Sequence, residues 1–395
     1  MTEEITTRSW WSRIKDAFIG IFIGIGLIIG AIVLIFWNER HSLHTAQSLE
    51  QTHKILISVP NSPINKENNF KVVYLSGQAT TNDQLEDSTL GITINAISLN
   101  RKVEMYQWEE KVETKTESQM GGSEKQIKTY SYDKIWSANL INSSNFKNPD
   151  GHQNPDTMPI HSLLQYAKTV TLGEFTLPDE LIRQINVSEP VDLSKVNKET
   201  LKSQYNKPIH LTNNELYLGQ EPQNPRPGDI RINLTAAYPQ IVSIIGQQTG
   251  NTLQAYLAPA GESVFLLSTG QQSADQMIEQ AQSKNKMMAW ILRLVSLFML
   301  IGGFSLILNP LVVLSDVLPF LGRIVGFGTG FISFICGLGI WIVVTAIAWF
   351  ATRPFLSIGL IAIVISGGYL IIKMRAKKIP SPPNPRSETT STKTE

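Results

Sequence analysis

A histidine flanked by acids is the part of this sequence that most resembles a reaction centre. His152 lies between Asp150 and Asp156 in the stretch DGHQNPD. A histidine beside a carboxylate can act as a general base, which would suit a hydrolase. No serine or cysteine motif such as a nucleophile elbow accompanies it. We interpret His152 as a structural residue and keep a membrane-anchored hydrolase as an alternative.

Three more histidines, His41, His44 and His53, follow the first apolar segment. Two histidines on one helical face can begin a metal site, but no third ligand follows at a convincing spacing. We therefore predict a solvated helix here, with neither a metal ion nor a cofactor.

Four apolar segments must position everything else in the chain. A helix needs about 20 apolar residues to cross the hydrocarbon core of a bilayer. The segments that meet this rule are Ala17–Trp37, Met288–Leu308, Ile324–Phe350 and Phe355–Ile372. Arg293 interrupts the second segment close to one end, where we expect it to reach the interface as an anchor.

Charges beside these segments predict the orientation of the chain. Four spans put both termini on one side, and the flanking basic residues assign that side to the cytoplasm. These residues are Arg8, Arg13, Lys15, Lys373, Arg375, Lys377 and Lys378. The segment 38–286 then lies in a periplasm or an organelle lumen. Arg353 is the one basic residue that this orientation places on the non-cytoplasmic side, against the rule.

The sequence predicts an α+β membrane protein with four transmembrane helices, one N-terminal and three C-terminal, and a large β-rich extracytoplasmic or lumenal domain. The expected parts are a cytoplasmic N-terminus 1–16, helix 17–37, the β-rich domain 38–286, helix 288–308, an interfacial or re-entrant cytoplasmic segment 309–323, helices 324–350 and 355–372, and a basic, then disordered tail 373–395.

Composition limits the chemistry of the exported region. Its roughly 250 residues are enough to bury a core of their own. The only cysteine, Cys336, lies in the third apolar segment, so the exported region is expected to fold without disulfides. The net charge of +1 and the absence of a basic stripe argue against nucleic acid as a partner.

Two aromatic runs flank Gly121 and Gly122, which predicts a long β-hairpin. Its aromatic residues, expected to make cross-strand contacts, are Tyr106, Trp108, Tyr130, Tyr132 and Trp136. We interpret them as packing residues rather than a ligand platform. Four alternating stretches in 230–268 predict an antiparallel meander, and Ser273 with Gln276 predicts a capping box that opens a helix.

Two features of the membrane segments could support contacts or transport. Gly20, Gly24, Gly26 and Gly30 give small-residue spacings that let a second helix approach closely. Asp316 is an acidic residue in the apolar segment 309–323 between two predicted spans, and two interpretations stay open for it. It is either a helix N-cap at the water boundary or a functional acid.

Several landmarks, in this order, resemble the transmembrane protein 43 family, also called LUMA, from the first span to the last. They are the run VEMYQW at 103–108, Tyr130, Tyr132, Trp136, Ile141 to Ser143, Asn145, Phe146, Gly151, His152, Asn154, Pro155, Gly228, Asp229, Arg231, Asp316, Pro319, Trp349, Arg353 and Pro354. The residues 191–223 and the tail depart from the family pattern.

The resemblance implies a multi-pass protein with a large lumenal domain that self-associates and organises membrane protein complexes. In animal members this means the endoplasmic reticulum and inner nuclear membrane, with envelope and lamina proteins as partners. In a bacterium the equivalent address would be the plasma membrane. The resemblance brings no catalytic residues, and we expect no enzyme. An oligomeric channel or transporter with Asp316 near its mouth remains a further alternative.

Overall fold

The computed structural model describes residues 2–186 and 188–350, with isolated residues between 355 and 373. The chain divides into two compact units. The β-rich unit comprises Met1–Arg13, His41–Ala289 and Leu314–Leu321, and the helical unit comprises Ile14–Arg40, Trp290–Val313 and Gly322–Glu395.

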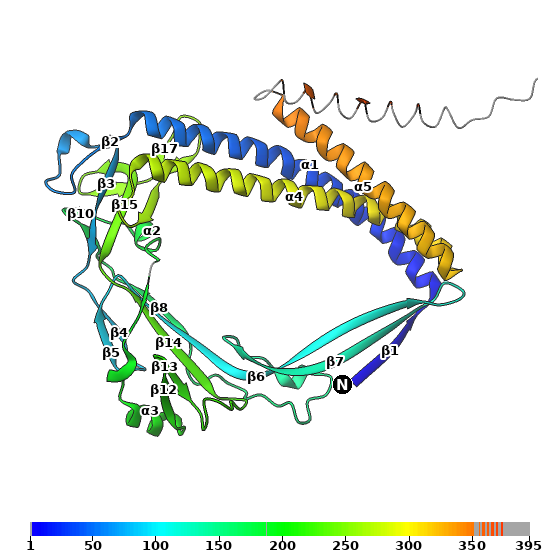
Figure 1. Ribbon diagram of the computed structural model, residues 1–395, viewed down its shortest axis with the longest axis horizontal. Helices are drawn as coiled ribbons and strands as arrows, with labels where there is room; N and C mark the ends of the chain where they lie inside the picture. The colour runs from blue at the N-terminus through cyan, green and yellow to red at the C-terminus, as the bar shows by residue number, and fades with distance from the viewer. Residues whose placement is uncertain are drawn as a thin grey trace, which may run out of the picture. The chain divides into compact units, whose positions relative to one another are not determined.

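The predicted hairpin is present and is the longest β structure of the chain (Figure 1). Strand β6 (Ser98–Ser118) pairs antiparallel with β7 (Glu124–Ser137). Gly121 and Gly122 make the turn with φ of 86° and 80°, values that a residue with a Cβ rarely adopts. Along β6, Leu99, Val103 and Met105 are buried, whereas most of the residues beyond Trp108 are exposed. The hairpin therefore has a buried base and a polar distal ribbon.

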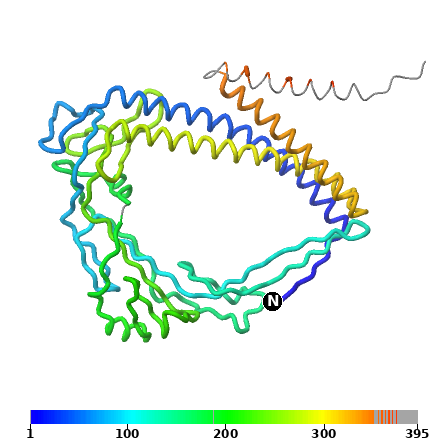
Figure 2. Tube along the Cα trace, viewed as in Figure 1, coloured from blue at the N-terminus to red at the C-terminus, as the bar shows by residue number. Residues whose placement is uncertain are grey.

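An N-terminal strand that the sequence analysis missed lies beside this ribbon. Strand β1 (Thr2–Arg8) pairs antiparallel with β7 from Thr2 opposite Tyr130 to Arg8 opposite Glu124. Figure 2 shows the same arrangement, with the N-terminal blue trace running beside the hairpin. β1, β7 and distal β6 thus form a three-stranded ribbon.

The hairpin base belongs to the first large sheet, whose strand order is β1-β7-β6-β14-β13-β12. Besides the hairpin and β1, its strands are β12 (Ile209–Thr212), β13 (Glu215–Leu218) and β14 (Ile230–Ala237), with β8 (Leu163–Tyr166) paired to β6 and β11 (Glu189–Pro190) paired to β14. In β14 every second residue from Ile230 to Ala236 is buried, as expected for a strand with one face on a core.

A second sheet has the order β19-β15-β16-β10-β9-β3-β2, with an additional pairing of β15 and β3. Its strands are β2 (Ile57–Ser58), β3 (Val72–Thr80), β9 (Thr171–Leu172), β10 (Phe175–Thr176), β15 (Gln240–Thr249), β16 (Thr252–Gln254) and β19 (Leu266–Thr269). The pairs β4 (Gln84–Asp87) with β5 (Ile92–Asn95) and β17 (Tyr256–Leu257) with β18 (Ser263–Val264) stand apart.

The predicted strands between 230 and 268 do not form one meander. β14 lies in the first sheet and β15 in the second, so the chain changes sheets at Tyr238 and Pro239. Alternation of apolar residues marks a strand but does not say which sheet it enters.

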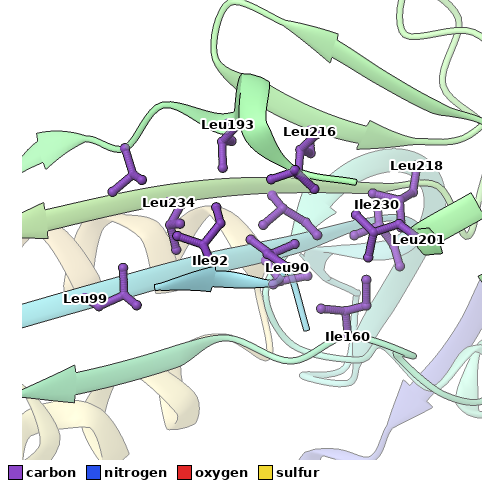
Figure 3. Close-up of a cluster of buried hydrophobic side chains, with 14 of the residues drawn as sticks. Leu90, Ile92, Leu99, Ile160, Leu193, Leu201, Leu216, Leu218, Ile230 and Leu234 are labelled. Atoms are coloured by element: carbon purple, nitrogen blue, oxygen red, sulfur yellow. The ribbon is translucent and has the colours of Figure 1, made fainter. Parts of the chain in front are cut away.

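Three apolar clusters hold the β-rich unit together. The first packs on the first sheet and is shown in Figure 3, where side chains of that sheet lie near side chains of 90–92 and 193; among those labelled are Leu99, Leu216, Ile230, Leu234, Leu90, Ile92 and Leu193. The second centres on Phe175, Leu75 and Ile244 of the second sheet. In the third, Leu49, Met277 and Ile278 pack against Val72 and Ile245. The ends of two long helices are thereby fixed to the second sheet.

The long helices are α1 (Trp10–Ile55), α4 (Ala274–Ser315) and α5 (Pro319–Trp349), and each is long and apolar enough to cross a membrane. The shorter α2 (Asp179–Ile182) and α3 (Lys198–Tyr205) lie in the β-rich unit, as do three 3₁₀ turns at Lys66–Asn68, Ser143–Asn145 and Leu193–Lys195. The predicted fourth span, 355–372, and Arg353 fall almost entirely outside the described residues.

The capping box is confirmed at the start of α4. The Ser273 amide donates to Gln276 Oε1 over 2.9 Å, and the Gln276 amide donates to Ser273 Oγ over 3.2 Å. The helix continues through Pro310 to Ser315, beyond the predicted end of the second span.

The pairing of β1 with β7 is not what the predicted sidedness would give. The prediction puts residues 1–16 and 38–286 on opposite sides of a bilayer, but strands that share one hydrogen-bonded ladder must share one side. The ribbon cannot reach through the membrane, since its charged side chains and open edges have no partners in hydrocarbon. We therefore expect residues 2–8 and the paired part of the hairpin to lie on the same side of a bilayer.

Candidate functional site

Asn154 is the polar centre of the hairpin base. Its Oδ1 accepts a hydrogen bond from the Trp108 amide over 2.7 Å, and its Nδ2 donates to the Trp108 carbonyl oxygen over 2.9 Å. Nδ2 also donates to the Ile141 carbonyl oxygen over 3.1 Å, and the Asn154 amide donates to Ser143 Oγ. One side chain thus ties the loop 138–162 to strand β6.

His152 lies between two aromatic rings beside Asn154. Its ring stacks on Tyr132 with centroids 3.9 Å apart and meets Trp108 edge-on at 4.8 Å. His152 Nδ1 is 3.1 Å from the Asn148 carbonyl oxygen. Burial, and next the hydrogen bond to Glu110, raise the pKa of the Tyr132 hydroxyl above its usual value. His152, which the alternative of a hydrolase would make the general base, is thus in contact with two aromatic rings and a backbone oxygen.

Asp229 closes the other side of the hairpin base. Its backbone oxygen accepts from the Tyr106 amide, and the Gly228 amide donates to the Tyr106 oxygen, each over 2.8 Å. Its buried carboxylate accepts from Tyr217 Oη over 2.6 Å and from the Arg226 amide over 2.8 Å. Burial, followed by this carboxylate, raises the pKa of Tyr217 well above its usual range. The loop 226–229 is therefore held to β6 by its main chain and to Tyr217 of β13 by the Asp229 side chain.

A polar cleft of about 310 Å³ opens beside this loop. It is lined by Trp136, Glu215, Tyr217, Pro225, Arg231 and Asn233 among others. The ring centroids of Trp136 and Tyr106 are 5.0 Å apart. The Arg231 guanidinium carbon lies 4.6 Å from the centroid of the Trp136 ring. Arg231 in turn pairs with Glu104 over 2.7 Å. The aromatic groups of the cleft are thus engaged with neighbours of the same chain.

Replacing Asn154 with alanine is expected to lower the stability of the β-rich unit by about 2–3 kcal/mol, because partly buried backbone groups of Trp108 and Ile141 lose their partner. Thermal unfolding of the detergent-solubilised chain measures the change. Asn148→Ala is the matched control, since the bonds of Asn148 to Tyr132 and His152 use its backbone. Equal melting temperatures for both variants would refute the bridging role.

A second cluster lies at the hairpin tip, within the β-rich unit; we call Arg13, Ser118, Gly122, Glu124 and Asp316 the tip cluster. Arg13 pairs with Asp316 over 2.5 Å and with Glu124 over 3.1 Å, and it donates to the Gly122 carbonyl oxygen over 2.7 Å. Ser118 Oγ donates to Asp316 Oδ2 over 3.1 Å. The carboxylate of Asp316 thus joins the start of α1, the hairpin and the turn after α4.

Main-chain and ring contacts reinforce the tip cluster. The Gly121 amide donates to the Val317 carbonyl oxygen over 3.0 Å. A Cβ at Gly122 would lie 2.4 Å from the Trp10 ring, so a glycine is needed here for space as well as for its positive φ. Of the two roles that the sequence left open for Asp316, neither describes its main contacts, which are with Arg13 and Ser118.

The helical unit contains a buried ion pair that corrects the interpretation of Arg293. Its guanidinium makes two hydrogen bonds to Glu39, of 2.6 and 2.8 Å, and Trp349 Nε1 donates to the same carboxylate over 2.6 Å. Arg293 is only 7% exposed and lies against the rings of Trp290 and Trp349. It is therefore an internal clamp between helices rather than an interfacial anchor.

The predicted close approach of another helix to the first span is made within the chain. A Cβ at Gly24 would lie 2.6 Å from the Gly303 carbonyl oxygen of α4, and one at Gly20 would lie 3.8 Å from Leu306. The face of α1 that carries Gly20 and Gly24 is therefore occupied by α4 of the same chain.

Gly24→Ala is expected to destabilise the helical unit by about 1–3 kcal/mol, since the backbone of α4 must move to admit a methyl group. Gly26→Ala is the matched control, because a Cβ there meets nothing within 4 Å. Thermal unfolding in detergent compares the two variants. A Gly24→Ala chain as stable as Gly26→Ala would contradict the close packing.

The juxtamembrane histidines have separate acidic neighbours. His41 Nδ1 lies 2.8 Å from Glu262 and His53 Nε2 lies 2.7 Å from Asp275. Among the described residues, no group of three or more His, Cys, Asp or Glu side chains has the arrangement of a metal site.

Sequence reasoning missed Arg13 and Glu39 as partners. Both were visible as charged residues flanking the first apolar segment, and a buried charge needs an opposite one. Their pairing with Asp316 and Arg293 joins residues some 250 to 300 positions apart, which no local pattern reveals.

The chain is similar in sequence to known membrane proteins of one family. The family described as Transmembrane protein 43 matches residues 105–354. The mouse protein Transmembrane protein 43 is 29% identical over 366 residues, covering 89% of this chain and 90% of the relative. The human protein is 28% identical, covering 91% and 90%, and the Drosophila melanogaster homolog is 27% identical, covering 88% and 91%. No solved structure matches the chain.

Proposed function

This chain belongs to the transmembrane protein 43 family, and on that basis we propose that it is a membrane scaffold whose copies associate and hold other membrane proteins together. Three apolar helices give it a bilayer environment. It acts in this proposal as a binding protein, without catalysing a reaction.

The main observation in support of this proposal is that the conspicuous polar side chains bond to groups within the chain. Asn154, Asp229, Asp316 and Arg293 each bond to groups of the same chain and join separate segments. His152 contacts a backbone oxygen and two rings. A reaction centre would leave such groups directed at a substrate. These groups instead stiffen a frame, which suits a protein that presents surfaces to partners.

The family resemblance also suggests in which membrane the protein is located. In animal cells we expect the endoplasmic reticulum and inner nuclear membrane, with envelope proteins as partners, and in a bacterium the plasma membrane. A fourth helix at 355–372 completes the proposed multi-pass insertion.

The mass of the intact detergent-extracted particle tests the proposal. One chain has a mass of 44.0 kDa, so a scaffold of associated copies should give a discrete multiple of that value after subtraction of the detergent. The multiple should persist on dilution to working concentration. A monomer under all solubilising conditions would overturn self-association.

A further inference from the structure

The outer edge of β1 is the open edge of a sheet. In the part of the chain that the structure describes, β1 has one neighbouring strand, β7, and stands at the end of the strand order. An edge strand presents a row of backbone donors and acceptors that another strand can use. Ile5 is 55% exposed on this strand. We propose that two copies of this chain associate by antiparallel pairing of their β1 strands, centred on Ile5; the inference rests on the proposed self-association and names its surface.

The order of residues in β1 makes this pairing self-complementary. With a two-fold axis at Ile5, Glu4 faces Thr6 of the second copy, Glu3 faces Thr7, and Thr2 faces Arg8. No two like charges are opposed, which avoids the main penalty for cross-strand pairs. A register centred on Glu4 would oppose two carboxylates, and one centred on Thr6 would leave Thr2 and Glu3 unpaired. The Ile5 register therefore pairs the whole strand without charge conflict.

The same register continues an apolar row across the interface. Within one chain, Ile5 lies directly opposite Ile127 of β7. Pairing about Ile5 places the Ile5 side chains of the two copies next to each other. Ile127 and Ile5 of one copy are then followed by Ile5 and Ile127 of the second copy in one row across the two ribbons. Side chains opposite each other on one sheet face make the contacts that stabilise strand pairs. The exposed Ile5, which has Ile127 on one side, thereby gains a second apolar neighbour on its open side.

The distal part of β6 is the competing edge of the same ribbon. Its residues between Glu109 and Glu117 include six Lys or Glu side chains, a composition that protects strand edges from pairing. A self-pairing centred on Thr114 would avoid opposed like charges, but the row through Thr114 leads to Lys128 of β7 rather than to an isoleucine. The β1 edge is therefore favoured by its apolar row and its lower charge.

Cross-linking of the full-length chain tests the pairing. Cys336→Ser removes the only cysteine, and Ile5→Cys then places a thiol at the proposed axis. A short bifunctional thiol reagent should join two Ile5→Cys chains in detergent, whereas Thr114→Cys chains in the same background should stay monomeric on a denaturing gel. Ile5→Glu, which opposes two carboxylates at the axis, should shift the native particle toward the monomer while leaving its melting temperature close to that of the parent.

The outcomes separate this inference from the scaffold proposal. An oligomeric parent chain that cross-links through Thr114→Cys, or through neither position, would overturn the β1 interface and leave self-association standing. A parent chain that is monomeric throughout would overturn both. Ile5→Glu particles of unchanged mass would also contradict the interface.

Discussion

Replacing Asp316 with alanine is expected to release the hairpin tip and to lower the free energy of unfolding by about 3 kcal/mol. The substitution leaves the buried Arg13 guanidinium with one carboxylate, Glu124, and removes the acceptor of Ser118. Removing one partner of a buried ion pair costs more than the pair contributes, because the remaining charge is left in a poor environment. Thermal unfolding in detergent measures the loss.

Limited trypsin digestion locates the same effect. Lys115 and Lys125 lie on the ribbon next to the tip cluster and should be cut faster in Asp316→Ala than in the parent. Asp133→Ala is the matched control on the same ribbon, since its pair with Lys111 is more than half exposed and should matter little. Cleavage at unchanged rates in Asp316→Ala would show that the tip is held by something else.

Replacing Glu39 with alanine is expected to destabilise the helical unit by about 3–5 kcal/mol, because Arg293 is left buried without its counter-ion. Trp349 loses its acceptor at the same time. The double variant Glu39→Met with Arg293→Met should recover much of the stability, since an apolar pair of similar volume carries no unpaired charge.

Denaturant unfolding of the solubilised chain compares these variants. The control is Glu50→Ala, which removes an exposed pair with Lys54 further along α1 and should leave the midpoint nearly unchanged. If the double variant were as unstable as Glu39→Ala, the unpaired charge would not be the cause of the loss.

Local patterns in the sequence predicted local structure well. The hairpin turn at Gly121 and Gly122, the capping box at Ser273 and the apolar helices all depend on residues near one another in the chain. The aromatic cross-strand contact of Tyr106 with Trp136 also follows from the register that the turn sets. For these features, spacing alone carries the information.

Long-range pairings were not predictable from the same patterns. The segment 2–8 consists mostly of Thr and Glu, and this polar composition did not indicate a strand, which forms by pairing with β7. Arg293 was interpreted as an anchor because its partner Glu39 lies in another helix, 254 residues away. The sidedness prediction rests on the charges beside the spans, and such charge counts take no account of strand pairing.

The proposed β1 interface depends on the pairing of β1 with the hairpin. The most direct test of this pairing is whether β1 and the hairpin lie on the same side of the membrane. Thr6 and Thr116 both lie opposite Gln126 on the two flanks of β7, and both are exposed. Each is replaced singly by cysteine in the Cys336→Ser chain, and sealed membranes are treated with an impermeant maleimide. We predict that the two positions react, or are protected, together. Labelling of one from outside and protection of the other would contradict the account.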